Sequence, residues 1–223
     1  MKKFLKNIYL KRSLLLLPAF LIIFCSCIGV SANVQMNADG SGRVTMEYRI
    51  SKMLDSIGML DGNASMPPVP VSRTDWERTV SRIPDTRLVS YSRKETSNDI
   101  IVNAVIGFNN PQALALVLCA SNDMVSVNVS GQSNNFDIIF TNGSNQYDAD
   151  FLKLMQGVFA DCNFSFSFNA PRNSTLTFTD ARGNAASAPA SAAAVTSGRN
   201  VSVSMNILDL LNYTNGLGVR ISW

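Results

Sequence analysis

Short runs in which apolar and polar residues alternate recur along most of the chain, and each run predicts a β-strand with one buried face. The clearest run covers 33–51, where Asp39 and Gly40 supply a turn between two alternating segments and so predict a hairpin. A second clear run covers 99–108 and pairs with the segment before it. The remaining predicted strands are 87–94, 124–129, 136–140, 163–168, 175–179, 200–205 and 217–223.

Helices are predicted where apolar residues recur every three to four positions. A capping-box pattern from Thr74 to Glu77 marks the start of one helix, and Asn110-Pro111 marks another. The predicted helices are 53–60, 74–83, 110–119 and 147–160, with a short helical turn at 207–211. Strands outnumber helices and occur in hairpins, so the pattern favours an α+β fold with a largely antiparallel sheet and short helices packed on one face.

Two connections are also predicted from local composition. The strands at 163–168 and 175–179 are separated by a polar segment with Pro171, which predicts a turn between neighbouring strands. Residues 185–197 are nearly all alanine and serine with Pro189 among them, and this composition predicts a flexible loop.

The first 32 residues differ from the rest of the chain. Five basic residues and no acidic residue precede the apolar stretch from Leu14 to Cys27, and small residues follow it. This arrangement is typical of a secretory signal. Cys27 stands directly behind the small residue Ser26, an order that resembles the lipobox of bacterial lipoproteins. The resemblance implies a lipoprotein signal peptide at 1–26, a tether at 27–32 and a single domain at 33–223.

Three interpretations of this stretch remain open. Lipid attached to Cys27 would tether the domain to a membrane, and palmitate would be among its acyl chains. Cleavage after Ala32 would instead use the small-residue site Val30-Ser31-Ala32. An uncleaved anchor is the third, although the run from 14 to 30 is short for a bilayer and contains Pro18.

Charge and histidine content exclude several classes of function. The formal charge of +3 includes five basic residues of the leader, so the part after residue 26 has 14 basic and 16 acidic residues. A net charge of −2 argues against a nucleic-acid partner. Histidine is absent, and no nucleophile, zinc or phosphate-loop motif occurs. We therefore expect no enzymatic activity, no bound metal and no cofactor.

Cysteine and methionine supply the remaining candidate residues. Cys119 and Cys162 form an even pair in an exported chain and are candidates for a disulfide, the alternative being two buried thiols. Nine methionines and twelve phenylalanines favour a deformable apolar surface. A cleft between helices and sheet would accept an acyl chain or another apolar ligand, and an ordinary core is the alternative. The candidate cleft residues are Met53, Met59, Trp76, Met155 and Phe159.

Several of these features together resemble known lipoproteins. The segment ending at Cys27 resembles a relaxed, spirochaete-like lipobox of bacterial lipoproteins. The turn at 37–42, the strand ending 48–51 and the segments 164–171 and 200–204 resemble the LppM-type domain family. The resemblance implies a lipid-binding α/β fold in the cell envelope.

We therefore expect a non-enzymatic envelope lipoprotein on the periplasmic or surface face of a bacterial membrane, with a lipid ligand. The alternative is a structural lipoprotein that binds an envelope protein and no small molecule.

Overall fold

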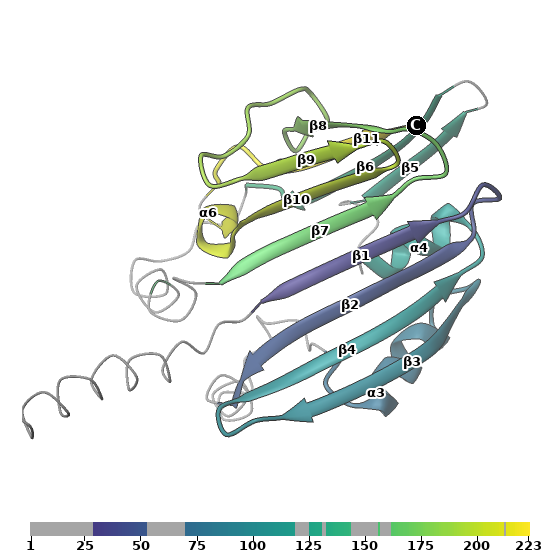
Figure 1. Ribbon diagram of the computed structural model, residues 1–223, viewed down its shortest axis with the longest axis vertical. Helices are drawn as coiled ribbons and strands as arrows, with labels where there is room; N and C mark the ends of the chain where they lie inside the picture. Colours follow the sequence, from purple (N-terminus) through teal and green to yellow (C-terminus); the bar gives the residue numbers. More distant parts are fainter. Residues whose placement is uncertain are drawn as a thin grey trace, which may run out of the picture.

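Two β-sheets form the body of the protein (Figure 1). The computed structural model describes residues 29–52, 70–118, 125–130, 133–143, 156, 162–211 and 213–223. The described elements are, in chain order, β1 (Val30–Met36), β2 (Gly42–Ser51), α3 (Arg73–Ser81), β3 (Thr86–Glu95), β4 (Asp99–Phe108), α4 (Pro111–Leu118), β5 (Val125–Ser130), β6 (Ser133–Thr141), β7 (Asn163–Asn169), β8 (Thr175–Thr179), β9 (Ala193–Ser197), β10 (Asn200–Asn206), α6 (Ile207–Leu211) and β11 (Leu217–Ser222). The predicted hairpin at 33–51 is present as β1 and β2.

The larger sheet has the strand order β3-β4-β2-β1-β7-β10-β9, and the smaller has the order β5-β6-β11-β8. All described pairings are antiparallel except one, in which β1 lies parallel to β7 with Val30 opposite Phe164. This parallel pair joins an N-terminal group of strands to a C-terminal group. The largely antiparallel prediction therefore holds, but the large sheet is mixed. The parallel pair is possible because β1 and β7 are joined by a long connection and not by a hairpin.

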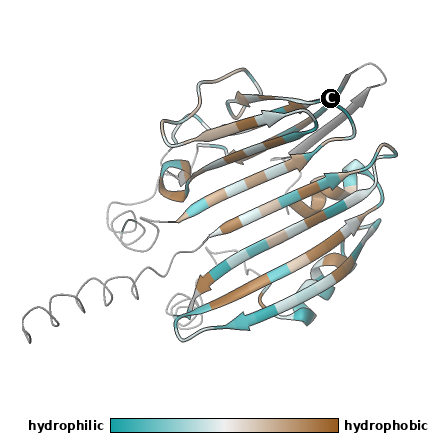
Figure 2. Ribbon diagram, viewed as in Figure 1, coloured by the Kyte–Doolittle hydropathy of each residue, from teal (hydrophilic) through white to brown (hydrophobic). Residues whose placement is uncertain are grey.

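The core lies on one face of the seven-stranded sheet, which we call the inner face. Every second side chain of its central strands is buried there, including Val34, Phe168 and Val201, which are opposite one another in register. The small sheet covers part of this face, because the Phe136 ring of β6 stacks on Phe168 at a centroid distance of 5.5 Å. Apolar and polar residues alternate visibly along these strands in Figure 2.

The helices do not form one layer. In Figure 1, α3 and α4 lie behind the large sheet, whereas α6 follows the end of β10. Buried Trp76 of α3 and Leu114 of α4 belong to the core cluster. The prediction of helices on one face therefore holds only in part, because the small sheet occupies much of the position that a helical layer would take.

The opposite face of the large sheet, called here the outer face, presents short uncharged polar side chains on its central strands. Their register places them in rows across three strands, β1, β7 and β10. The rows are Ser31–Ser165–Ser204, Asn33–Ser167–Ser202 and Gln35–Asn169–Asn200. These side chains are exposed or half-buried. Alternation of polar and apolar residues thus gives the sheet one buried face and one solvent-exposed face.

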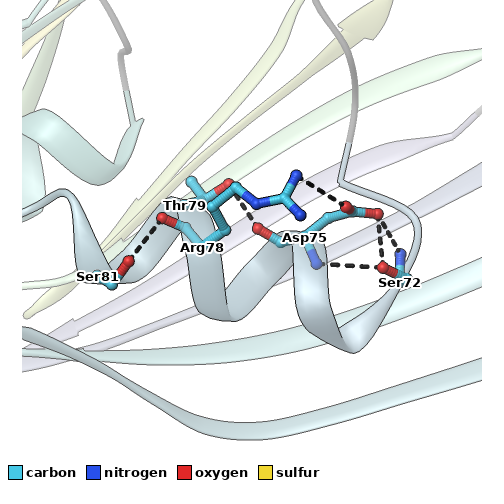
Figure 3. A network of polar contacts seen from close by, with 5 residues as sticks. All are labelled: Ser72, Asp75, Arg78, Thr79 and Ser81. Carbon is cyan, nitrogen blue, oxygen red and sulfur yellow. Dashed lines mark hydrogen bonds and ion pairs between the residues drawn. The ribbon is translucent and has the colours of Figure 1, made fainter.

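The cap of α3 differs from the predicted one by two residues (Figure 3). Ser72 is the N-cap, and its hydroxyl accepts from the Asp75 backbone N–H at 3.1 Å. The Asp75 carboxylate in turn accepts from the Ser72 backbone N–H at 3.1 Å and from the Ser72 hydroxyl at 2.6 Å. The pattern from Thr74 to Glu77 therefore lies inside the helix, because Ser72 and Asp75 form the capping box two residues earlier.

Two connections also differ from the expectation. β7 and β8 do not pair across the Pro171 turn, because β7 belongs to the large sheet and β8 pairs with β11 in the small one. Within the predicted flexible loop at 185–197, residues 193–197 form β9 along β10. β9 is exposed along its length, so its pairing depends on backbone hydrogen bonds rather than on buried side chains.

Candidate functional site

The first strand begins close to the candidate lipidation site. Cys27 lies outside the described residues, and only Ile28 and Gly29 separate it from β1. The Gly29 carbonyl already accepts from the Arg49 backbone N–H at 3.0 Å. Residues 30–32, expected to belong to the tether, instead form the first part of β1, where Ala32 is buried between Met46 and Phe166. The sheet therefore starts almost directly after Cys27.

The one candidate cleft residue within the described residues is Trp76, and it lies on α3 against the inner face of the sheet. Its side chain is 4% exposed, and its ring centroid is 6.4 Å from that of Tyr48 on β2. Within the described part of the chain, its indole Nε1 is a buried donor without a hydrogen-bond partner. A buried N–H without an acceptor costs about 1–3 kcal/mol. The Tyr48 hydroxyl lies close by, because the indole N–H acts to lower the pKa of that phenol.

Two tyrosines hold the start of α3 against the sheet. The Tyr48 hydroxyl donates to the Pro70 carbonyl, and the Tyr91 hydroxyl donates to the Val71 carbonyl at 2.6 Å. Burial raises the pKa of Tyr48, against a weaker opposing effect of the nearby Trp76 indole, and burial also raises the pKa of Tyr91. Both phenols therefore stay protonated near neutral pH and remain donors to the backbone. We call this arrangement the tyrosine clamp.

The other predicted site residues are only partly described. Met53, Met59, Met155 and Phe159 lie outside the described residues, so the proposed cleft stays a prediction. Cys119 also lies outside them, and Cys162 is buried just before β7. The disulfide between these two cysteines likewise stays a prediction.

The surface cavities among the described residues include the following two. The larger, of about 660 Å³, lies near Asp180, Arg182 and Tyr213 and has a mainly polar lining. The smaller, of about 250 Å³, lies between the Asn37–Gly40 turn and Trp223 and has a mixed lining. Both are open to solvent, and neither has the enclosed apolar shape expected for an acyl chain.

One charge pair joins two strands of the small sheet. Arg220 of β11 donates twice to Asp137 of β6, at 2.6 and 3.1 Å, and this contact raises the pKa of Arg220. The pair therefore braces the small sheet. Among the residues that the structure describes, no group of three or more possible metal ligands occurs.

Sequence reasoning missed a group of basic residues at the start of β1. Arg49 and Lys52 of the β2 end lie near Arg93 and Lys94 of the β3 end, although the two pairs are more than 40 positions apart. Glu95 bonds Lys52 at 3.0 Å and Arg93 at 2.7 Å. No run of like charges signals this group in the sequence, because its members come from two strands that meet only through β4.

Among the residues that the structure describes, no helix has the length and apolarity needed to cross a membrane. No protein family model matches the chain, and no curated protein matches it. The chain is similar in structure to the folded domain of LppM from Mycobacterium tuberculosis, determined by NMR. The similarity covers 86% of this chain and 88% of that domain, with a TM-score of 0.46 and 8% identity. It is a distant likeness of overall arrangement, and no ligand or activity is transferred from it.

Proposed function

We propose that the chain is a non-enzymatic lipoprotein of a bacterial cell envelope, whose domain is held at the membrane by acyl chains on Cys27. The observation that carries the proposal is the position of β1. Removal of residues 1–26 leaves every described strand whole, whereas cleavage after Ala32 would remove three residues from a strand paired on both sides. Several acyl chains, at about 0.8 kcal/mol per buried methylene, anchor a protein stably where one chain would not.

The anchor is tested by the intact mass of protein isolated from membranes and by metabolic labelling with palmitate. The expected mature chain begins at Cys27 and carries a glyceride with acyl chains. Cys27→Ala is expected to abolish the label, while Cys25→Ala, which alters a cysteine of the leader, keeps it. A mature N-terminus at Asn33, or equal labelling of the parent and Cys27→Ala, contradicts the proposal.

The absence of enzymatic activity is part of the proposal. The polar contacts described above have structural roles: Ser72 and Asp75 cap α3, and Asp137 and Arg220 join two strands. With no histidine in the chain, a hydrolytic or transfer reaction would need serine, carboxylate or lysine groups brought together.

We propose further that the domain accommodates a lipid or another apolar ligand beside Trp76. The buried indole N–H supports this, because an ester or carboxylate oxygen of a ligand would supply the acceptor that the described residues lack. The chain has two tryptophans, so Trp223→Phe leaves Trp76 as the single reporter. A brominated fatty acid is expected to quench that fluorescence, whereas the matched Trp76→Phe variant, which retains Trp223, is quenched little.

Lipid extraction of protein purified from membranes provides the second measurement for this ligand. We expect a non-covalent lipid to be released in addition to the acyl chains on Cys27. Equal quenching in both tryptophan variants, together with protein that releases no such lipid, would exclude an apolar ligand at this position.

The outer face of the large sheet favours a second candidate function, the docking of an envelope protein. Its exposed serine, asparagine and glutamine rows lie on strands whose other face is buried in the core. A photo-crosslinking residue at Asn33 is expected to capture a defined protein in intact cells. The same probe at Thr177, on the small sheet, serves as the matched control. Capture at neither position argues against this candidate.

A further inference from the structure

The short distance between Cys27 and β1 fixes which end of the protein lies at the membrane, given the lipid anchor of the proposed function. Three residues span at most about 10 Å when fully extended, and the headgroup layer of one leaflet is roughly 5–8 Å thick. Val30 therefore lies at or just above the headgroups. β2 has ten residues and is roughly 33 Å long, so the turn at Asp39 and Gly40 lies at the far end of the sheet.

Arg49 is the charged residue nearest to the anchor in the described structure. Its backbone N–H is bonded to Gly29, two residues after Cys27, and its side chain is exposed on the outer face. Lys94 lies on the same face, since Lys94 and Arg49 are both opposite Ile101 of β4. Two strand spacings separate them, about 10 Å. Lys52 follows the end of β2, where its backbone N–H donates to the Asn98 carbonyl.

These side chains and that of Arg93 form a group at this end of the sheet that we call the basic edge. Arg93 is opposite buried Val102, so it lies toward the inner face, whereas Arg49 and Lys94 lie on the outer face. Three acidic residues lie near its four basic residues: Glu95, which bonds Lys52 and Arg93; Asp99, which is buried at the start of β4; and Glu47, which is exposed on the outer face two residues before Arg49 and accepts from the Asn103 side-chain amide at 3.2 Å. Among the described residues, neither Arg49 nor Lys94 has an ion-pair partner. Four basic against three acidic residues leave the basic edge with a formal excess of one positive charge, at the end of the sheet that the anchor brings to the bilayer.

We propose that the basic edge contacts anionic phospholipid headgroups and thereby orients the domain on the membrane surface. Positive side chains within a Debye length of an anionic bilayer are attracted to it, and the anchor holds them inside that distance. The lipid on Cys27 supplies retention, whereas the basic edge supplies orientation. In this orientation the strands of the large sheet point away from the bilayer, and the polar rows of the outer face are exposed to the solvent of the envelope.

The test uses the full acylated protein, purified from membranes and reconstituted into vesicles of phosphatidylcholine with or without phosphatidylglycerol. A water-soluble amine-acetylating reagent reports on Lys94 and Lys52, with mass spectrometry of the peptides as readout. Arg87→Lys places a matched control lysine on β3 at the far end of the sheet. We expect severalfold slower acetylation of Lys94 in the anionic vesicles than in the neutral ones, and no difference at the introduced control lysine.

A pair of charge reversals on β2 makes the test specific. Arg43 and Arg49 are both exposed on the outer face of this strand, at its opposite ends. Arg49→Glu is expected to raise the acetylation of Lys94 in anionic vesicles to the neutral-vesicle rate, and Arg43→Glu is expected to leave it unchanged. Thermal unfolding of both variants in detergent shows that each remains folded.

Three outcomes overturn the inference, and they are distinguishable. If the mass shows acyl chains on Cys27 but Lys94 reacts equally in both vesicle types, the anchor stands and the headgroup contact is wrong. Protection that persists equally in Arg49→Glu also overturns it, and indicates instead that protein covers this end. A purified protein without acyl chains overturns the proposed function and this inference together.

Discussion

Gly42 shows how closely three strands approach one another at the start of β2. A Cβ atom on this residue would overlap the Gln35 carbonyl oxygen of β1 and lie 2.6 Å from Cζ of Phe108 on β4. Both neighbours belong to the interior of the large sheet and cannot move freely. Only glycine therefore fits between these strands.

Gly42→Ala is expected to lower the free energy of unfolding by about 1–3 kcal/mol, because the added methyl group overpacks a fixed position. Urea denaturation measures the change. Gly29→Ala is the matched control, since the nearest atom to its added Cβ is the Asn163 carbonyl oxygen at 4.0 Å. Equal stability of the two variants would contradict the proposed close approach.

Asp75 links the capping of α3 to pH. Hydrogen bonds from the hydroxyl and the backbone N–H of Ser72 lower the pKa of the Asp75 carboxyl below its ordinary value. A carboxyl whose pKa is lower in the folded state stabilises the fold above its unfolded pKa, and this contribution is lost as the pH falls through the folded pKa.

Asp75→Asn is therefore expected to destabilise the protein at pH 7 and to lose that effect progressively below about pH 4. Urea midpoints at several pH values measure the difference from the parent. Glu77→Gln changes an exposed acid of the same helix that pairs with Arg73 at 3.7 Å, and it serves as the control. A pH-independent difference for Asp75→Asn would rule out the ionised cap.

At the scale of elements, the sequence predicted the strands that form hairpins but not the arrangement of the sheets. The pairs β1–β2 and β3–β4 follow directly from alternation and a short connection. The β1–β7 pair, and the placement of β8 beside β11, do not, because alternation specifies which face is buried and not which strand is the neighbour. The Ser72 cap was missed because Thr74 and Glu77 satisfy the same pattern two residues later.

The candidate site was predictable to a lesser extent than the strands. Trp76 was selected for its place on an amphipathic helix, but its unpartnered N–H depends on the atoms around it. The basic edge could not be predicted from the sequence for a related reason: its residues lie on β2 and β3, which are brought together only by their pairing with β4. Sequence patterns report local periodicity, whereas sites require contacts between distant segments.

The contact between the two sheets gives a prediction at this scale. Phe168 is 1% exposed and lies 5.5 Å from the Phe136 ring and 5.4 Å from the Trp223 ring, measured between centroids. Phe168→Ala is expected to cost about 3–5 kcal/mol of unfolding free energy, because it leaves a cavity between the sheets. Val195→Ala on β9, where the side chain is 60% exposed, is expected to change it by less than about 0.5 kcal/mol. Similar losses in both would contradict the packed interface.

At the scale of the whole molecule, the start of the mature chain determines whether the central strand is complete. A chain that begins at Gly29 keeps all of β1, whereas a chain that begins at Asn33 loses Val30, Ser31 and buried Ala32. The lost residues pair with β2 on one side and β7 on the other.

The chain beginning at Asn33 is expected to be less stable by roughly 2–4 kcal/mol, because several ladder hydrogen bonds at about 1 kcal/mol each disappear with them. Urea denaturation of the two chains measures this loss. A third chain begins at Gly29 and carries Ser31→Ala. It is the control, because it changes a side chain of β1 but keeps the backbone hydrogen bonds of that strand. Equal stability of the Gly29 and Asn33 chains would remove the structural argument for a mature start at Cys27.

The parallel seam between β1 and β7 bears on how the protein is made. When the chain is exported from its amino end, β1 to β4 leave the export channel first and can pair with one another. The second edge of β1 stays unpaired until β7, which begins near Phe164, has also been exported. During export the large sheet is therefore incomplete, and one edge of β1 has unpaired backbone groups close to the lipid anchor. Export factors that shield such an edge are therefore expected to determine the yield of folded protein.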